Sequence, residues 1–161
     1  MLHRLMNDKP VLGWREWVSL PDLGVDPIKA KVDTGARSSS LHALDIEQFG
    51  RDGRRWVRFV VSPWQHSGLD PVVAESPLHD MREVRSSTGE SESRPVITTR
   101  VRIGSHDYST ELTLTDRSEM GFRMLLGREA IRGRYLVDSS RSYRTGKPSK
   151  AIRRRNREQH S

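Results

Sequence analysis

A short acidic turn after an alternating strand is the feature that most constrains how this chain can fold. Residues 28–32 alternate between apolar and charged side chains, and Asp33-Thr34-Gly35-Ala36 follows directly. Such alternation predicts a strand with one buried face. Gly35 has no Cβ and permits both a tight turn and the close approach of another chain. The pattern therefore presents one carboxylate at the end of a strand, although an ordinary strand-to-loop corner has the same composition.

A carboxylate held in this way suits peptide hydrolysis, which needs two carboxyl groups. An ionised group activates water, while a protonated one polarises the scissile carbonyl. The chain has 161 residues and one such motif, and this length normally makes a single domain. A two-fold symmetric dimer would bring Asp33 from both subunits. The motif predicts a homodimeric aspartic peptidase with Asp33 as the catalytic residue and Thr34, Gly35 and Ala36 supporting the catalytic loop.

A second segment has the pattern expected beside such a loop. Residues 124–126 are apolar, and Gly127-Arg128, Glu129 and a predicted helix follow them. This resembles retropepsin-like domains, in which a Gly-Arg pair precedes the single C-terminal helix and Gly permits close contact with the catalytic loop. A buried strand with a turn would explain either segment alone. The two motifs in this order favour the retropepsin-like fold, with Gly127 and Arg128 as structural residues near the site.

The resemblance extends to one bacterial family. Four separated blocks, residues 33–43, 84–89, 94–97 and 114–120, resemble in order those of the RimB-type retropepsin-like aspartic peptidases. The match spans residues 11–140. Members of this family have been labelled ATP-dependent zinc proteases and are encoded beside an ATP-grasp ligase that adds glutamates to a ribosomal protein.

What the resemblance implies is specific. The fold would be a mostly β closed barrel with one short C-terminal helix, assembled as a homodimer. The activity would be an aspartic endopeptidase, without a cofactor, that trims poly-glutamate tails from the ribosomal protein. The glutamate ligase would be a functional partner of this chain.

The polar stretch at residues 86–93 predicts a flap, a hairpin that folds over substrate with Gly89 near its tip. A flexible surface loop is the alternative. Because guanidinium groups bind carboxylates in a bidentate fork, basic residues near the loop and flap are candidates for reading glutamate side chains. The predicted substrate-binding residues are Arg37, Arg85, Ser86, Ser87 and Gly89.

Arg37 departs from the retroviral pattern. Retroviral enzymes carry an acid at this position, which pairs with the arginine of the later Gly-Arg, so that bridge cannot form here in the same way. Arg37 either pairs with Glu129 or faces the cleft. For Arg85, the alternative to substrate binding is a solvated strand position.

Charge is unevenly distributed along the chain. Lys and Arg number 28 against 21 acids, giving a net charge of +7, and part of the excess lies in residues 141–157. Residues 1–10 are interpreted as an N-terminal extension, 11–140 as the peptidase domain and 141–161 as a basic, disordered tail. A positive field attracts acidic partners, and both poly-glutamate and ribosomal RNA are acidic.

The competing hypothesis is a non-catalytic retropepsin-like module that binds RNA or the ribosome through its basic surface. The intact Asp33-Thr34-Gly35 argues against it, because a binding module needs no pair of carboxylates.

Several other features limit the function. Without cysteine, disulfides and thiolate metal sites are excluded. The six histidines show no metal-binding spacing and there is no phosphate-binding Gly-rich loop, so no metal site is predicted and His42 is expected to be structural. No segment approaches the roughly 20 apolar residues of a membrane span, and the N-terminus lacks a signal-peptide core. A cytoplasmic protein with no membrane contact is expected.

The remaining pattern predicts strands. Residues 56–61, 96–103 and 108–114 are alternating or β-branched, as short strands of a small barrel are. A polar insertion at residues 68–77 has no role that its composition discloses.

Overall fold

The computed structural model describes residues 9–85, 88–116 and 121–158, which form strands for most of their length. The elements in chain order are β1 (Val11–Leu12), β2 (Arg15–Leu20), the 3-10 helix η1 (Pro21–Leu23), β3 (Val25–Val32), β4 (Ser39–His42), β5 (Leu44–Arg51), β6 (Arg54–Val61), β7 (Val72–Pro77), β8 (Asp80–Arg85), β9 (Ser91–Ile103), β10 (His106–Thr115), β11 (Met124–Leu126), α2 (Arg128–Ile131), β12 (Leu136–Val137) and α3 (Lys150–Arg157).

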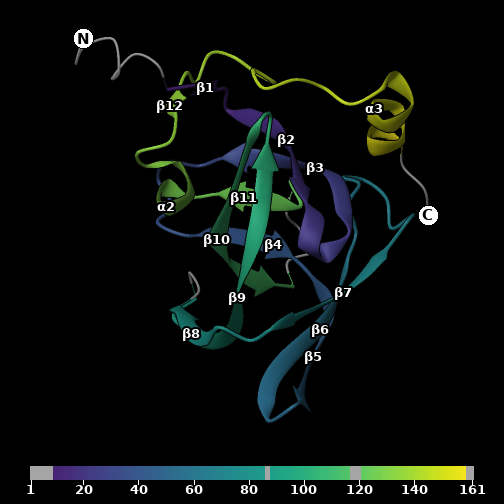
Figure 1. Ribbon diagram of the computed structural model, residues 1–161, viewed down its shortest axis with the longest axis vertical. Helices are drawn as coiled ribbons and strands as arrows, with labels where there is room; N and C mark the ends of the chain where they lie inside the picture. Colours follow the sequence, from purple (N-terminus) through teal and green to yellow (C-terminus); the bar gives the residue numbers. More distant parts are fainter. Residues whose placement is uncertain (1–8, 86–87, 117–120, 159–161) are drawn as a thin grey trace.

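Six strands close into a barrel (Figure 1). Their order is β10-β4-β11-β3-β2-β9, and β9 returns to pair with β10 over eight residue pairs. Strand β8 pairs with the N-terminal part of β9, while β5, β6 and β7 form a separate three-stranded sheet. The prediction of a mostly β, closed retropepsin-like barrel is confirmed.

The core follows the predicted alternation. Phe59 on β6 and Ile97 on β9 are fully buried, and each has an exposed polar neighbour along its strand, Arg58 and Thr98. Leu112 on β10 is also fully buried, at the start of a run of four buried residues, 112–115. Burial of such side chains stabilises the fold by roughly 1.5–3 kcal/mol each. The predicted strands at 56–61, 96–103 and 108–114 all lie within observed strands. The polar insertion contains a strand that the composition did not reveal, β7, which pairs with β6.

The segment predicted to be a disordered tail is ordered where the structure describes it. Residues 141–149, here called the C-terminal strap, run along β2, and Glu16 on that strand is completely buried beneath them. Its carboxylate accepts hydrogen bonds from the backbone N–H of Arg144 (2.9 Å) and of Thr145 (3.1 Å) and from the Thr145 hydroxyl (2.8 Å). The disorder prediction is wrong here because these polar groups find partners on the barrel.

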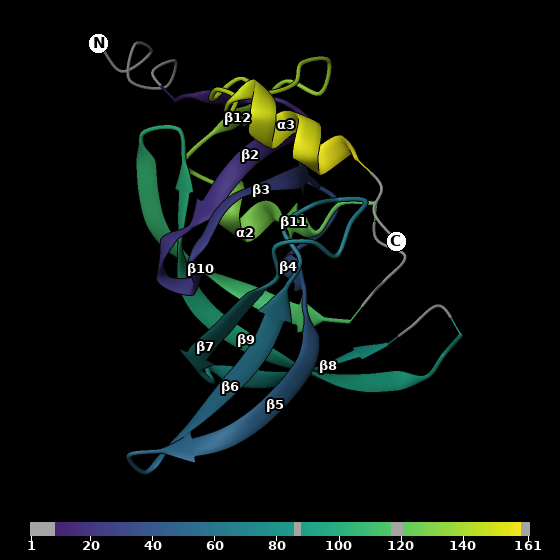
Figure 2. The ribbon, with the colours of Figure 1, turned by 90° about the vertical axis from the view of Figure 1, so that its right-hand side faces the viewer.

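The strap leads into α3, which Figure 2 shows lying across the β2 side of the barrel. Ser149 caps this helix, its hydroxyl accepting a bond from the N–H of Ile152 at 3.3 Å. Asn156 is buried on the barrel side, where its side chain bonds the Gln65 backbone N–H and side-chain carbonyl. No helix among residues 9–85, 88–116 and 121–158 is long and apolar enough to span a membrane.

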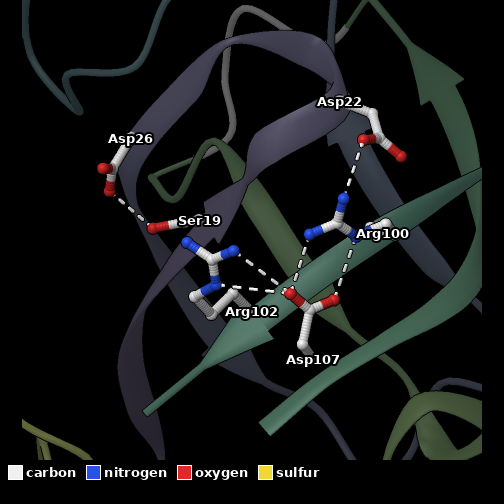
Figure 3. A network of polar contacts seen from close by, with 6 residues as sticks. All are labelled: Ser19, Asp22, Asp26, Arg100, Arg102 and Asp107. Atoms are coloured by element: carbon white, nitrogen blue, oxygen red, sulfur yellow. Dashed lines mark hydrogen bonds and ion pairs between the residues drawn. The ribbon is translucent and has the colours of Figure 1, made fainter. Parts of the chain in front are cut away.

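A surface network joins β9 and β10 to η1, the 3-10 helix between β2 and β3 (Figure 3). Asp107 accepts hydrogen bonds from Arg100 (2.9 and 3.1 Å) and from Arg102 (3.2 and 3.4 Å). Arg100 also reaches Asp22 at 3.4 Å. These arginine bonds, chiefly that from Arg100, lower the pKa of Asp107 to about 2.

Candidate active site

The acidic turn forms a loop whose backbone fixes the Asp33 carboxylate. β3 ends at Val32, and the Asp33 N–H donates to the carbonyl of Leu126 at 2.8 Å. The N–H of Ala36 returns to the Asp33 carbonyl at 3.2 Å, which closes the turn. The N–H of Gly35 donates to the Asp33 carboxylate oxygen Oδ1 at 3.0 Å. A half-buried carboxylate is thus presented at the end of a barrel strand.

The second motif lies directly beside this loop. β11 pairs in parallel with β3, with Leu126 opposite Val32. A Cβ on Gly127 would lie 2.4 Å from the carbonyl oxygen of Ser38, which is closer than real Cβ atoms approach. Only glycine allows the two chain segments to meet at this distance. The Gly127 N–H also donates to the Ser39 hydroxyl at 3.0 Å.

Arg128 holds the Asp33 loop in place through carbonyl groups. Its Nη1 donates to the carbonyl oxygens of Thr34 (3.1 Å) and Gly35 (3.0 Å), and its backbone N–H donates to that of Ala36 at 2.8 Å. The retroviral arginine would use an acid at the position of Arg37 instead. In this chain the arginine of the Gly-Arg segment still holds the loop, but it donates to backbone carbonyl oxygens instead of to an acidic side chain.

Arg37 makes the first of the two contacts considered for it. Its Nε lies 2.9 Å from Glu129 Oε1, and the Glu129 N–H donates to the Arg37 carbonyl at 3.1 Å. The Arg37 side chain is nevertheless 82% exposed. The bridge uses Nε, so the two terminal nitrogens are still able to bind another carboxylate.

A polar pocket of about 340 Å³ adjoins this bridge and includes residues that sequence reasoning missed. Arg82 on β8 lies 3.3 Å from Glu111, which also lies 3.0 Å from His79. The pocket therefore contains two arginines, each paired with a glutamate. Its lining consists of Arg37, Ser38, Arg82, Glu111 and Glu129.

The predicted flap region contains a hairpin. β8 and β9 pair antiparallel up to Arg85 opposite Ser91, and Gly89 has a φ of +85°, which favours glycine. Ser86 and Ser87 lie outside the described residues. Side chains alternate between the faces of a strand, so Arg85 points away from the face that carries Arg82. The alternation of side chains along β8 was the sequence signal that could have separated Arg82 from Arg85.

The described residues contain no group of three or more His, Asp or Glu side chains able to hold a metal ion. His42 lies on β4 with 1% of its surface exposed. Burial lowers the pKa of His42, and the positive charge of Arg123 lowers it further. A neutral, buried imidazole in the barrel wall fits the expected structural role.

Comparison with known proteins places this geometry in a family. Two curated relatives are named "Probable alpha-L-glutamate ligase": one from Shewanella halifaxensis, 46% identical over 142 residues, and one from Parasynechococcus marenigrum, 48% identical over 141. The matched part is 88% of this chain but only 31% and 30% of those proteins.

A solved structure of a Legionella pneumophila protein described as of unknown function is 28% identical, with a TM-score of 0.69. The similarity covers 84% of this chain and 98% of that one. The family model described as "Retropepsin-like aspartic endopeptidase RimB" matches residues 11–148, which include the Asp33 loop, the Gly-Arg segment and most of the strap. The chain belongs to this RimB-like family of retropepsin-like aspartic endopeptidases.

Proposed function

We propose that this protein is an aspartic endopeptidase that works as a homodimer and hydrolyses α-linked poly-glutamate tails on a ribosomal protein. The observation that carries the proposal is the Asp33 loop. Its carboxylate is fixed by the Gly35 N–H, and its backbone is braced by Arg128 and packed against Gly127. Positioning of this kind is what a general acid or base requires.

In the proposed dimer, Asp33 from each subunit faces the two-fold axis. Two carboxylates held close together share one proton, because both cannot be ionised at once. The ionised one takes a proton from water, whose oxygen attacks the scissile carbonyl carbon. The other gives its proton to the carbonyl oxygen. The tetrahedral intermediate then collapses and the C–N bond breaks. The leaving nitrogen takes the proton that the first carboxylate received from water, and one hydroxyl of the intermediate returns its proton to the second carboxylate.

The substrate class is drawn from the relatives. They are named alpha-L-glutamate ligases, and the region similar to this chain is about a third of each. An α linkage between glutamates is an ordinary peptide bond, so an endopeptidase can hydrolyse the polymer that such a ligase makes. The guanidinium groups of Arg37 and Arg82 border the pocket beside the catalytic loop, where a glutamate carboxylate could receive charge-assisted hydrogen bonds.

Mass spectrometry tests this proposal directly. A peptide ending in eight α-linked glutamates is incubated with the wild-type protein and with Asp33→Asn, which keeps the shape of the side chain. We expect the wild type to remove glutamates and the variant to leave the peptide intact. A γ-linked octaglutamate of the same mass serves as the control and should not be cut. Equal cleavage by Asp33→Asn would contradict the proposal.

A further inference from the structure

A basic groove lies between the barrel and the C-terminal part of the chain. One wall is formed by β2 and β3, and the other by the C-terminal strap and α3, which Figure 2 shows above these strands. The cavity has a volume of about 260 Å³. Its lining, here called the basic groove, consists of Arg15, Trp17, Lys29, Tyr143, Lys147, Arg153 and Arg157. No residue of the catalytic loop is among them.

The charge of the basic groove is not balanced within the described residues. Five of its seven lining residues are Lys or Arg, and none of the seven is acidic. In the part of the chain that the structure describes, none of the five forms an ion pair. Other arginines do form ion pairs: Arg82, Arg100 and Arg155, for example, each lie within 4 Å of a carboxylate. A concentration of uncompensated cations in a concave site favours an anionic ligand.

Two residues that line the basic groove each carry a buried donor with no acceptor. Trp17 Nε1 and Arg153 Nε are both inaccessible to solvent and form no hydrogen bond. Buried donors are almost always satisfied in folded proteins, and an unsatisfied one costs free energy. The two donors come from opposite walls, β2 and α3.

The groove is preformed, because the strap is fixed to the barrel. A Cβ on Gly13 would lie 2.2 Å from the Arg141 carbonyl oxygen, so the two segments are in direct contact. The Glu16 carboxylate binds Gly13 at 2.6 Å as well as Arg144 and Thr145. The Ser149 cap then sets where α3 begins. Preorganised sites bind ligands without a further ordering cost.

We propose that the basic groove is a second binding site for an acidic peptide chain, taking carboxylate side chains of a glutamate-rich segment outside the catalytic site. The inference rests on the proposed function for the identity of the polymer. An adjoining cavity of about 240 Å³, lined by Lys150, Arg153, Arg154 and Arg157, continues the basic surface along α3. A continuous run of cations suits an extended polyanion better than a single ion.

The aromatic rings favour a peptide over RNA. Single-stranded RNA is usually bound by stacking bases on open aromatic faces. Here Trp17 is only 7% exposed. The Tyr143 ring already has Arg15 at 4.9 Å, Lys29 at 5.4 Å and Lys147 at 5.5 Å from its centroid. The rings hold the cations by cation–π contact and offer no free platform for a base.

Fluorescence anisotropy tests the site, with every protein carrying Asp33→Asn so that the probe is not cut. The probes are fluorescein-labelled deca-glutamate, deca-glutamine and oligo-uridylate. The groove variants are the pair Arg153→Gln and Arg157→Gln on α3 and, separately, Lys29→Gln on the opposite wall. The control pair, Arg54→Gln and Arg55→Gln, lies at the exposed start of β6 and removes the same charge as the α3 pair. Circular dichroism checks that each variant is folded.

We expect deca-glutamate to bind, deca-glutamine not to bind, and both groove variants to weaken binding about tenfold or more for each charge-assisted bond lost. The control pair should change the affinity less than threefold. Equal weakening by the control pair overturns the proposal, as does oligo-uridylate binding that is tighter than deca-glutamate binding and is lost in the groove variants. Because no cleavage is measured, a protein without peptidase activity would still give a clear result here.

Discussion

At the residue scale, Arg128 is the side chain that holds the Asp33 loop by its backbone carbonyls. Arg128→Lys keeps the charge, but its shorter side chain does not bring a nitrogen to the position from which Nη1 donates to both the Thr34 and Gly35 carbonyls. We expect kcat/KM on poly-glutamate to fall roughly tenfold to a hundredfold, since hydrogen bonds from a charged group contribute about 1.5–3 kcal/mol. Arg132→Lys, an exposed arginine four residues later, is the control and should behave like the wild type. Unchanged kinetics in Arg128→Lys would show that the loop does not need this brace.

Arg37 requires a test that separates its bridge from substrate recognition. Arg37→Ala removes the guanidinium, whereas Glu129→Gln breaks the same ion pair and leaves Arg37 in place. Exposed ion pairs stabilise a fold by only about 0–1 kcal/mol. If Arg37 reads glutamate, Arg37→Ala should lose about tenfold in kcat/KM on poly-glutamate and little on poly-glutamine, while Glu129→Gln keeps its activity. Equal losses in both variants would assign Arg37 to the bridge alone. Arg85→Ala tests, in the same assay, whether the arginine predicted beside the flap binds substrate.

At the scale of elements, the C-terminal strap depends on one buried carboxylate. Glu16→Ala would leave the N–H groups of Gly13, Arg144 and Thr145 without their acceptor. We expect a loss of about 3 kcal/mol in the free energy of unfolding and faster amide hydrogen exchange through residues 141–158. Thr145→Val removes only one of the bonds and should cost a fraction of this. Unchanged exchange in Glu16→Ala would show that the strap is held by other contacts.

The β9–β10 network gives a pH dependence with a defined sign. The pKa of Asp107 is lowered to about 2, mainly by its hydrogen bond from Arg100, against an ordinary value of 3.8. The stability that this pair contributes is present above pH 4 and is lost as the pH falls towards 2. In Asp107→Asn, urea unfolding midpoints should therefore fall less between pH 5 and pH 3 than in the wild type. Parallel curves for the two proteins would contradict this.

How far the sequence predicted these elements depends on whether their causes are local. The Asp33 turn, β3, β11 and the start of α2 follow from strand alternation and from glycine at 35 and 127, and all were predicted. The strap was missed because it depends on Glu16 contacting residues 128 and 129 positions away. The sequence around a buried acid in an alternating strand does not show which distant residues will donate hydrogen bonds to it. The acceptors of Arg128 were missed for a related reason, since backbone carbonyls have no sequence signature.

At the scale of the whole molecule, the central prediction is that one chain is half an enzyme. The barrel presents one Asp33 carboxylate, while hydrolysis by this chemistry requires two. If the active unit is a two-fold dimer, mixing wild type with a ninefold excess of Asp33→Asn puts most wild-type chains into mixed dimers. Activity per wild-type chain should then fall to about a tenth, because only dimers of two intact chains are active.

The control for this mixing experiment is an equal excess of a protein that cannot enter the dimer, such as serum albumin, which should leave activity unchanged. Pre-incubation matters, since subunits must exchange before substrate is added, and activity should fall with time until exchange is complete. Rates should also rise faster than linearly with enzyme concentration where dimers are partly dissociated. Activity per wild-type chain that is unaffected by the Asp33→Asn excess after full exchange would mean that each chain carries a complete site. The second proton-transfer group would then have to come from the same subunit.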